Sequence, residues 1–325
     1  MKTFNQINEI ISNELNGIDW NKAPNGLYDP IAYVLSLGGK RIRPALTLMA
    51  CNLFSDDLTP ALPSALGLEI FHNFTLLHDD IMDKADVRRG RPTVHKKWDE
   101  NTAILSGDVM QIKAFQYMAQ TPIDQLKRSL DLFSNTAAEI CEGQQYDVEF
   151  EGRDKVEADE YLEMIRLKTA VLLACSLQIG AWIGGANETD ANLLYEIGIN
   201  LGLAFQLKDD LLDVYGDEAT FGKKIGGDIL CNKKTYLLIH ALELAKDQDA
   251  EDLESWLMRM DIQDGDAKIH AIRSIFNRAG VKEICEEKMD FFFKKAMKQL
   301  DLIAVSEDKK QELRTLSEKL MYRLD

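Results

Sequence analysis

Two aspartate clusters of identical spacing are the residues of this chain best suited to chemistry. The first is Asp79-Asp80-Ile81-Met82-Asp83 and the second is Asp209-Asp210-Leu211-Leu212-Asp213. On a helix that advances about 100° per residue, the first, second and fifth residues of such a cluster share one face. Grouped carboxylates suit a hard cation, and Mg²⁺ commonly binds a few carboxylates together with substrate phosphates. A solvated acidic helix face would explain one cluster, but two clusters of identical spacing favour a metal site that binds a diphosphate.

Basic residues at glycine turns accompany the clusters. Gly38-Gly39-Lys40-Arg41-Ile42-Arg43-Pro44 places three cations before a helical pattern, and Arg88-Arg89-Gly90-Arg91-Pro92-Thr93 follows the first cluster. Arginine forks bind phosphate oxygens in pairs, so adjacent arginines that point in different directions could hold two separate anions. Lys168 stands at the head of an apolar run, where a charge needs a ligand or a carboxylate nearby. Each basic segment taken alone could also be an ordinary exposed turn.

Helices must position these side chains, because apolar residues recur at helical spacing through most long segments. Phe4, Ile7, Ile11 and Leu15 show this pattern, sustained period-two alternation is absent, and every proline lies at or before Pro122. We therefore predict an all-α chain. Both clusters can serve one site only if their helices border a common cavity, which predicts a single helical-bundle domain over residues 1–325.

Composition limits the partners and the compartment. The net charge of −16 argues against binding to nucleic acid or to an anionic membrane surface. The five cysteines are scattered singly, which suits a reducing compartment, and we expect them to be buried small apolar residues. The N-terminus lacks the apolar run of a signal peptide, and the longest apolar stretch, residues 169–185, falls short of the ~20 residues that span a bilayer. We expect a soluble cytoplasmic protein without a membrane span.

The motifs resemble those of the trans-isoprenyl diphosphate synthases, the polyprenyl synthetase family that includes farnesyl and geranylgeranyl diphosphate synthases. Further markers of this resemblance are Glu142-Gly143-Gln144, Lys168-Thr169, Phe205-Gln206 and Gly222-Lys223. The likeness runs from about Gly38 to Thr235 and implies the all-helical isoprenoid synthase fold, Mg²⁺ as cofactor and a homodimer. It also implies a transferase of isoprenoid biosynthesis, which condenses isopentenyl diphosphate with dimethylallyl, geranyl or farnesyl diphosphate.

The resemblance also implies a role for individual residues. The principal Mg²⁺ ligands would be Asp79, Asp83 and Asp209, supported directly or through water by Asp80, Asp210 and Asp213. The allylic diphosphate would face Arg88, Lys168, Thr169, Gln206, Lys223 and Lys233. Isopentenyl diphosphate would be held by Lys40, Arg43, His72 and Arg89. The catalytic residues would be Asp79, Asp80, Asp83, Lys168, Asp209 and Asp210, because Mg²⁺ ions held by the aspartates, together with cationic side chains, would draw electron density from the allylic diphosphate.

Product length should depend on the side chains below the first cluster. Phe74 lies about 7.5 Å and Phe71 about 12 Å back from Asp79 along the helix axis. Both could form the floor of a product pocket, and both could equally be ordinary core aromatics. In the family, an aromatic at five positions before the motif with a small residue at four, here Thr75, resembles the geranylgeranyl type. We expect a twenty-carbon product, with fifteen carbons as the alternative.

Three other functions deserve comparison with this prediction. A class I terpene cyclase shares the helical fold, but its second metal motif normally has an Asn-Ser/Thr-Glu pattern that Asp209 to Asp213 does not resemble. A non-catalytic regulatory subunit of a heteromeric synthase typically loses an aspartate cluster or the paired arginines, and this chain has them all. A calcium-binding protein would need a 12-residue loop of alternating oxygen ligands, which accompanies neither cluster.

Overall fold

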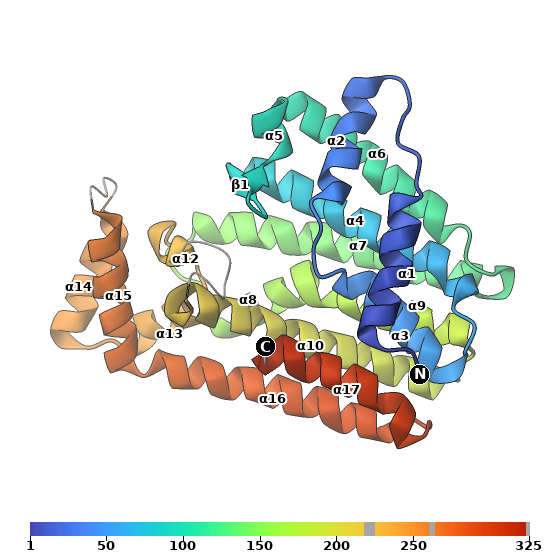
Figure 1. The fold of residues 1–325 in the computed structure, drawn as a ribbon. Coiled ribbons are helices and arrows are strands. Elements are labelled where there is room, and N and C mark those ends of the chain that lie inside the picture. The colour runs from blue at the N-terminus through green and yellow to red at the C-terminus, as the bar shows by residue number, and fades with distance from the viewer. Residues whose placement is uncertain (218–224, 260–263, 323–325) are drawn as a thin grey trace. The chain divides into compact units, whose positions relative to one another are not determined.

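The computed structural model describes residues 1–217, 225–259 and 264–322, which fall into two compact units (Figure 1). The first unit comprises Met1–Asn135, Leu172–Glu196 and Leu300–Leu316, and the second comprises Thr136–Val171, Ile197–Gln299 and Ser317–Asp325. Each unit is therefore built from three separate stretches of chain. The single domain expected from the sequence stays a prediction.

Almost all regular structure in the described ranges is helical. In the N-terminal part the helices are α1 (Phe4–Asn16), α2 (Asn25–Ser36), α3 (Ile42–Phe54), η1 (Thr59–Ala61), α4 (Leu62–Met82), α5 (Val94–Lys97), α6 (Glu100–Met118) and α7 (Ile123–Glu151). There follow α8 (Ala158–Ile165), η2 (Arg166–Ala170), α9 (Val171–Gly184), α10 (Glu188–Tyr215), α12 (Gly227–Leu230) and α13 (Tyr236–Leu244). The C-terminal part contains α14 (Asp247–Met258), α15 (Gly265–Ala279), α16 (Val281–Leu302) and α17 (Glu307–Tyr322).

The described strands form one short antiparallel hairpin, β1 (Val87–Arg88) and β2 (Arg91–Pro92), within the basic segment that follows the first aspartate cluster. The predicted all-α fold is thus confirmed. Helix α1 shows why the sequence pattern was informative: Ile7, Ile11 and Leu15 are its buried residues, and the Thr3 side chain accepts a hydrogen bond from the Gln6 backbone N–H at the first turn.

In the first unit, α4 packs along α6 over most of its length (Figure 1). Two glycines permit this close approach. A Cβ atom on Gly67 would lie 2.9 Å from the carbonyl oxygen of Ala114, and one on Gly107 would lie 2.3 Å from the His78 ring. His78 directly precedes the first aspartate cluster, so the packing of α4 on α6 fixes the helix end that carries these carboxylates.

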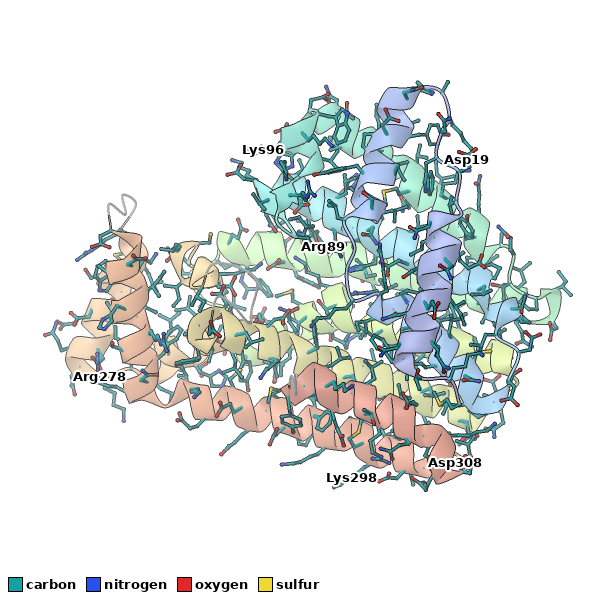
Figure 2. The ribbon with its side chains drawn as sticks, viewed as in Figure 1. Asp19, Arg89, Lys96, Arg278, Lys298 and Asp308 are labelled. Carbon is teal, nitrogen blue, oxygen red and sulfur yellow. The ribbon has the colours of Figure 1, made fainter. Side chains whose placement is uncertain are left out.

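In the second unit, α10 carries the second cluster and approaches the chain near η2 closely. A Cβ atom on Gly202 would lie 2.4 Å from the Cα atom of Ala170, so this crossing requires glycine. Helices α14 and α15 lie side by side (Figure 1), and an ion pair of 2.7 Å joins Arg278, labelled in Figure 2, to Asp249. These contacts hold α14 against α15.

The cysteine prediction is wrong in part. Cys51, Cys175 and Cys285 are buried thiols, as expected, but Cys141 and Cys231 are exposed. Cys141 belongs to α7, and Cys231 directly follows α12.

One helical stretch, Ala158–Gly184, is long and apolar enough by composition to cross a membrane. Within its most apolar window, 78% of the residues are buried inside the structure. A core helix of a folded domain passes the same test of length and apolarity.

Candidate active site

The first aspartate cluster lies at the C-terminal end of α4. Asp79 and Asp80 belong to its last turn and Asp83 is the C-cap residue. Carboxylates are unfavourable at this end of a helix, because the helix dipole already concentrates negative charge there. The arrangement therefore raises the local affinity for cations.

Asp80 and Arg88 were predicted to serve different groups, but here they bind each other. The Arg88 Nε atom donates to Asp80 Oδ1 and Oδ2 at 2.8 and 2.9 Å, and Arg88 Nη2 lies 2.7 Å from Oδ1. Burial raises the pKa of Asp80 above its ordinary value, although the Arg88 guanidinium opposes this shift. Both carboxylate oxygens are therefore engaged by β1, whereas Asp83 is exposed.

The β1–β2 hairpin also places Arg89 against the glycine turn before α3. Arg89, labelled in Figure 2, donates a hydrogen bond to the carbonyl oxygen of Gly38. A Cβ atom on Gly39 would lie 2.8 Å from the Arg89 guanidinium carbon, and Gly39 has a φ of 129°. This turn thus needs glycine both for its backbone conformation and for the approach of the arginine.

Three of the residues expected to hold isopentenyl diphosphate lie close to one another in the first unit. Arg43 Nη1 lies 3.0 Å from His72 Nε2, so this ring nitrogen accepts the hydrogen bond. Burial, together with the charge of Arg89, lowers the pKa of Arg43 to about 10, although Glu69 opposes the shift. Burial and the charges of Arg43 and Arg89 hold the pKa of His72 well below its ordinary value, so His72 is neutral.

The central arginine of the same basic motif has a different environment. Arg41 adopts a left-handed backbone conformation with φ of 49°, and its guanidinium binds the buried Glu69 carboxylate at 2.5 Å and the Leu35 carbonyl oxygen at 2.5 Å. Arg41 therefore secures the turn from inside, while Lys40 is exposed. Sequence spacing alone could not separate these two roles.

A short π-helical segment, η2, presents Lys168 and Thr169 between α8 and α9. Single π-helical turns of this kind occur frequently at functional sites. Gly143 of α7 makes the arrangement possible, because a Cβ atom there would lie 2.4 Å from the Lys168 backbone nitrogen. The Thr169 hydroxyl donates a hydrogen bond of 3.3 Å to Gln206 Oε1 on α10.

The second aspartate cluster opens onto a cavity of about 160 Å³ in the second unit. The cavity is lined by Asp147, Tyr161, Met164, Ile165, Lys168, Thr169, Gln206, Asp209, Asp210, Asp213, Asp228, Lys233 and Thr235. Sequence analysis predicted Lys168, Thr169, Gln206, Asp209, Asp210, Asp213 and Lys233 from this set. Lys223, also predicted, lies outside the described residues. A cavity that combines carboxylates with ammonium groups suits a metal-bound diphosphate.

Within this cavity Asp210 is the most deeply buried aspartate, with 2% of its surface exposed. The Tyr161 hydroxyl donates to its Oδ2 atom at 2.5 Å, and Gln206 Nε2 donates to its Oδ1 atom at 3.4 Å. Burial and the nearby Asp228 carboxylate raise the pKa of Asp210 well above its ordinary value. In both clusters, therefore, the second aspartate is buried and bonded to a side chain from another element.

Asp147, Tyr161 and Asp228 are cavity residues that sequence analysis missed. Asp147 lies one helical turn after Gly143 of the Glu142-Gly143-Gln144 marker, but nothing in that marker distinguishes it from a surface aspartate. Asp228 follows a glycine pair, and its backbone N–H donates to Asp213 Oδ2 at 3.1 Å. Tyr161 carried no signal that distinguishes it from a core aromatic.

The proposed product-length residues are buried in the first unit. The Phe71 and Phe74 rings meet edge to face with centroids 5.3 Å apart, and Phe71 also meets Phe133 of α7 at 5.1 Å. The Thr75 hydroxyl donates to the His72 carbonyl oxygen at 2.8 Å. Two aromatic rings thus separate the end of α4 from Phe133.

Comparisons with known proteins agree with this fold and site. A family model described as polyprenyl synthetase matches residues 24–275. A geranylgeranyl diphosphate synthase from Methanosarcina mazei is 45% identical over 223 residues, which cover 68% of each chain. A geranylfarnesyl diphosphate synthase from Natronomonas pharaonis is 36% identical over 321 residues, covering 93% of this chain and 90% of that one.

Solved structures extend the likeness to the whole chain. A crystal structure of a geranylgeranyl pyrophosphate synthase matches with a TM-score of 0.94 and 44% identity and covers 99% of both chains. The synthetase from Pyrococcus horikoshii Ot3 matches with a TM-score of 0.91 and 33% identity, covering 98% and 97%. The fold is thus that of the all-helical isoprenoid synthases. The chain belongs to the polyprenyl synthetase family and is a prenyltransferase, which confirms the resemblance found in the sequence.

Proposed function

We propose that this prenyltransferase condenses isopentenyl diphosphate with dimethylallyl, geranyl and farnesyl diphosphate and that its main product is the twenty-carbon geranylgeranyl diphosphate. The observation that carries the proposal is the second-unit cavity, in which Lys168 and Lys233 accompany Asp209 and Asp213. The names of the similar proteins support a short-chain product, since they include geranylgeranyl and geranylfarnesyl diphosphate synthases.

Mg²⁺ is the proposed cofactor. Its principal ligands would be Asp79, Asp83 and Asp209, while the hydrogen-bonded Asp80 and Asp210, together with Asp213, would support them. No three acidic, histidine or cysteine side chains of the described residues are already arranged around one ion. The donor set nevertheless fits Mg²⁺, which keeps several waters and takes substrate phosphate oxygens beside one or two carboxylates. When bound, Mg²⁺ would supply positive charge that stabilises the departing diphosphate.

The allylic diphosphate would bind to Arg88, Lys168, Thr169, Gln206, Lys223 and Lys233. Their cationic and polar groups stabilise the negative charge that develops on the diphosphate as its bond to carbon 1 breaks. The bond electrons leave with pyrophosphate, and an allylic cation forms. Isopentenyl diphosphate, held by Lys40, Arg43, His72 and Arg89, then donates its double-bond electrons to carbon 1 of that cation. Loss of one proton, for which pyrophosphate is the available base, gives the product.

The test of this proposal is incubation of the purified protein with Mg²⁺, radiolabelled isopentenyl diphosphate and each allylic diphosphate in turn. We expect a twenty-carbon alcohol after dephosphorylation of the products. A reaction that stops at fifteen carbons would replace the geranylgeranyl assignment by farnesyl. No incorporation by folded protein would contradict the enzyme proposal and favour a regulatory subunit, and a hydrocarbon product would favour a terpene cyclase.

We also propose that the chain forms a homodimer through the outer face of α6. Ile104, Leu105 and Ile112 on this helix are 42%, 57% and 57% exposed, although all three are large and apolar. An exposed apolar stripe on one helix suits a self-complementary interface about a two-fold axis. A cytoplasmic location is part of the proposal, since the exposed thiols of Cys141 and Cys231 suit a reducing compartment.

The double substitution Leu105→Lys and Ile112→Lys is expected to halve the molar mass of the protein in solution, because it would bury four charges in the interface of the dimer. Light scattering after gel filtration measures this mass. Leu302→Lys is the matched control, since Leu302 is 69% exposed on α16 and lies outside the α6 face. A wild-type monomer would contradict the homodimer, and a dimeric double variant would contradict the choice of α6.

A further inference from the structure

One face of α7 is built to meet Lys168. Gly143 and Asp147 are four residues apart on this helix, so they lie on the same side, and both are buried. The missing side chain of Gly143 lets the α7 backbone contact the backbone of Leu167 and Lys168. One turn further along, the Asp147 carboxylate reaches the Lys168 ammonium group. Backbone contact and side-chain contact therefore fix the same lysine.

Asp147 also reaches a second lysine from a remote part of the chain. Its Oδ2 atom lies 2.5 Å from Lys168 Nζ and 3.5 Å from Lys233 Nζ. Lys233 lies in the turn between α12 and α13, and its backbone N–H donates to the Asp228 carbonyl oxygen at 2.9 Å. A single carboxylate oxygen thus binds one ammonium group from η2 and one from this turn.

The three side chains differ in exposure in a way that suits substrate binding. The Asp147 side chain is 10% exposed, whereas those of Lys168 and Lys233 are 20% and 36% exposed. Although burial alone would raise the pKa of Asp147, the ammonium groups of Lys233 and Lys168 lower it below its ordinary value. Asp147 is therefore ionised. Each ammonium group has three donors, so the bond to Asp147 uses only part of the hydrogen-bonding capacity of each lysine.

The same cavity contains four other aspartates: Asp209, Asp210, Asp213 and Asp228. Two lysines in such a site could pair with any of them, and a lysine bound to Asp209 would occupy an oxygen proposed to bind Mg²⁺. Two ammonium groups without a shared counter-charge would also repel each other in a partly buried site. A fifth carboxylate, Asp147, is placed on a different helix from the second cluster and supplies the shared counter-charge.

We propose that Asp147 is a positioning residue that holds Lys168 and Lys233 together as a clamp for the allylic diphosphate. This inference rests on the proposed function of the cavity. It names a third helix, α7, as a determinant of diphosphate binding. Lys168 and Lys233, the partners of Asp147, are both proposed to bind the allylic diphosphate, so we expect the role to be specific to this substrate.

Asp147→Asn tests the proposal, because it keeps the size of the side chain and removes its charge. We expect the variant to bind an allylic thiolodiphosphate, whose carbon–sulfur bond resists ionisation, about tenfold more weakly than wild type. Affinity for isopentenyl diphosphate should change by less than about twofold. Titration calorimetry in the presence of Mg²⁺ measures both affinities without turnover, and the melting temperature and helical circular dichroism report folding.

Asp131→Asn is the matched control. Asp131 lies on the same helix and binds Lys127 at 2.5 Å, but this ion pair is exposed and distant in sequence from the cavity residues. We expect it to leave both affinities unchanged. Should Asp147→Asn fail to fold, Asp147→Ser, which can still accept a hydrogen bond from an ammonium group, is measured by the same criteria.

Two results would overturn the role of Asp147: unchanged binding of the thiolodiphosphate, or equal weakening of both ligands, which would indicate general loosening of the structure. Wild-type turnover is measured alongside. Its absence would contradict the proposed function, while the binding ratio would still decide the role of Asp147. Normal turnover together with unchanged thiolodiphosphate binding would reject Asp147 alone.

Discussion

Asp209→Asn is expected to lower kcat/KM for the allylic substrate by about a thousandfold. Asp209 lines the cavity that contains Lys168 and Lys233, and it is one of the three proposed principal ligands of Mg²⁺. A catalytic metal contributes several kcal/mol of charge stabilisation, and a loss of about 4 kcal/mol corresponds to this factor. Incorporation of radiolabelled isopentenyl diphosphate measures the change, and the Mg²⁺ concentration for half-maximal rate should rise in the variant.

Asp210→Asn should be less damaging than Asp209→Asn. Asp210 accepts hydrogen bonds from Tyr161 and Gln206, so we infer that it supports the site without binding the ion directly. Residues that orient metal ligands typically contribute about 10- to 100-fold. Glu188→Gln is the control on the same helix, because Glu188 binds Arg128 at the exposed start of α10. Equal losses for Asp209 and Asp210 would contradict the division of roles within the cluster.

Much of the cavity was predictable because its residues lie in local motifs. Lys168 and Thr169 form one marker, Gln206 and Asp209 belong to another, and the structure brings both to the same cavity. The helices were predictable for a similar reason. Burial of one helix face requires apolar residues every three to four positions, and this spacing is visible in the sequence. Hydrophobic spacing in α1 therefore matched its buried residues.

The remaining features depend on contacts between distant segments, which local patterns do not encode. Asp147 stands between the exposed Tyr146 and Val148, so its own neighbourhood predicts a surface aspartate. Its function became visible only when α7 was found against η2. The directions of Arg41 and Arg43 depend on the left-handed backbone at Arg41, and nothing in a row of basic residues specifies that conformation.

The same limit applies to Phe71 and Phe74, which spacing could not distinguish from ordinary core aromatics. In the structure the Phe74 ring packs against the Phe71 ring with centroids 5.3 Å apart, and the Phe71 ring packs against Phe133 with centroids 5.1 Å apart. Phe74 also meets the ring of His78, the residue before the first aspartate cluster, at 4.8 Å. Phe74 is therefore the first of these phenylalanines that a chain growing from that cluster along α4 would meet.

Phe74→Ala is expected to shift the main product from twenty carbons to twenty-five or more. Removing the ring opens space below the first cluster as far as Phe71. This space is apolar, so it can accept a further isoprene unit of the growing chain. The substitution should also lower the free energy of unfolding by about 3–5 kcal/mol, because it leaves a cavity in the core. Chromatography of the dephosphorylated products measures the first effect, and denaturant unfolding measures the second.

Phe293→Ala separates product length from stability. Phe293 is a buried aromatic of α16 that packs against Tyr322 at 5.4 Å, and it belongs to the unit that does not contain Phe74. Its loss should cost a similar amount of stability and leave the product at twenty carbons. If both variants lengthened the product, general loosening of the core would be the cause. If neither variant lengthened the product, Phe74 would not be the floor of the product pocket, because removing the floor should let the chain grow further.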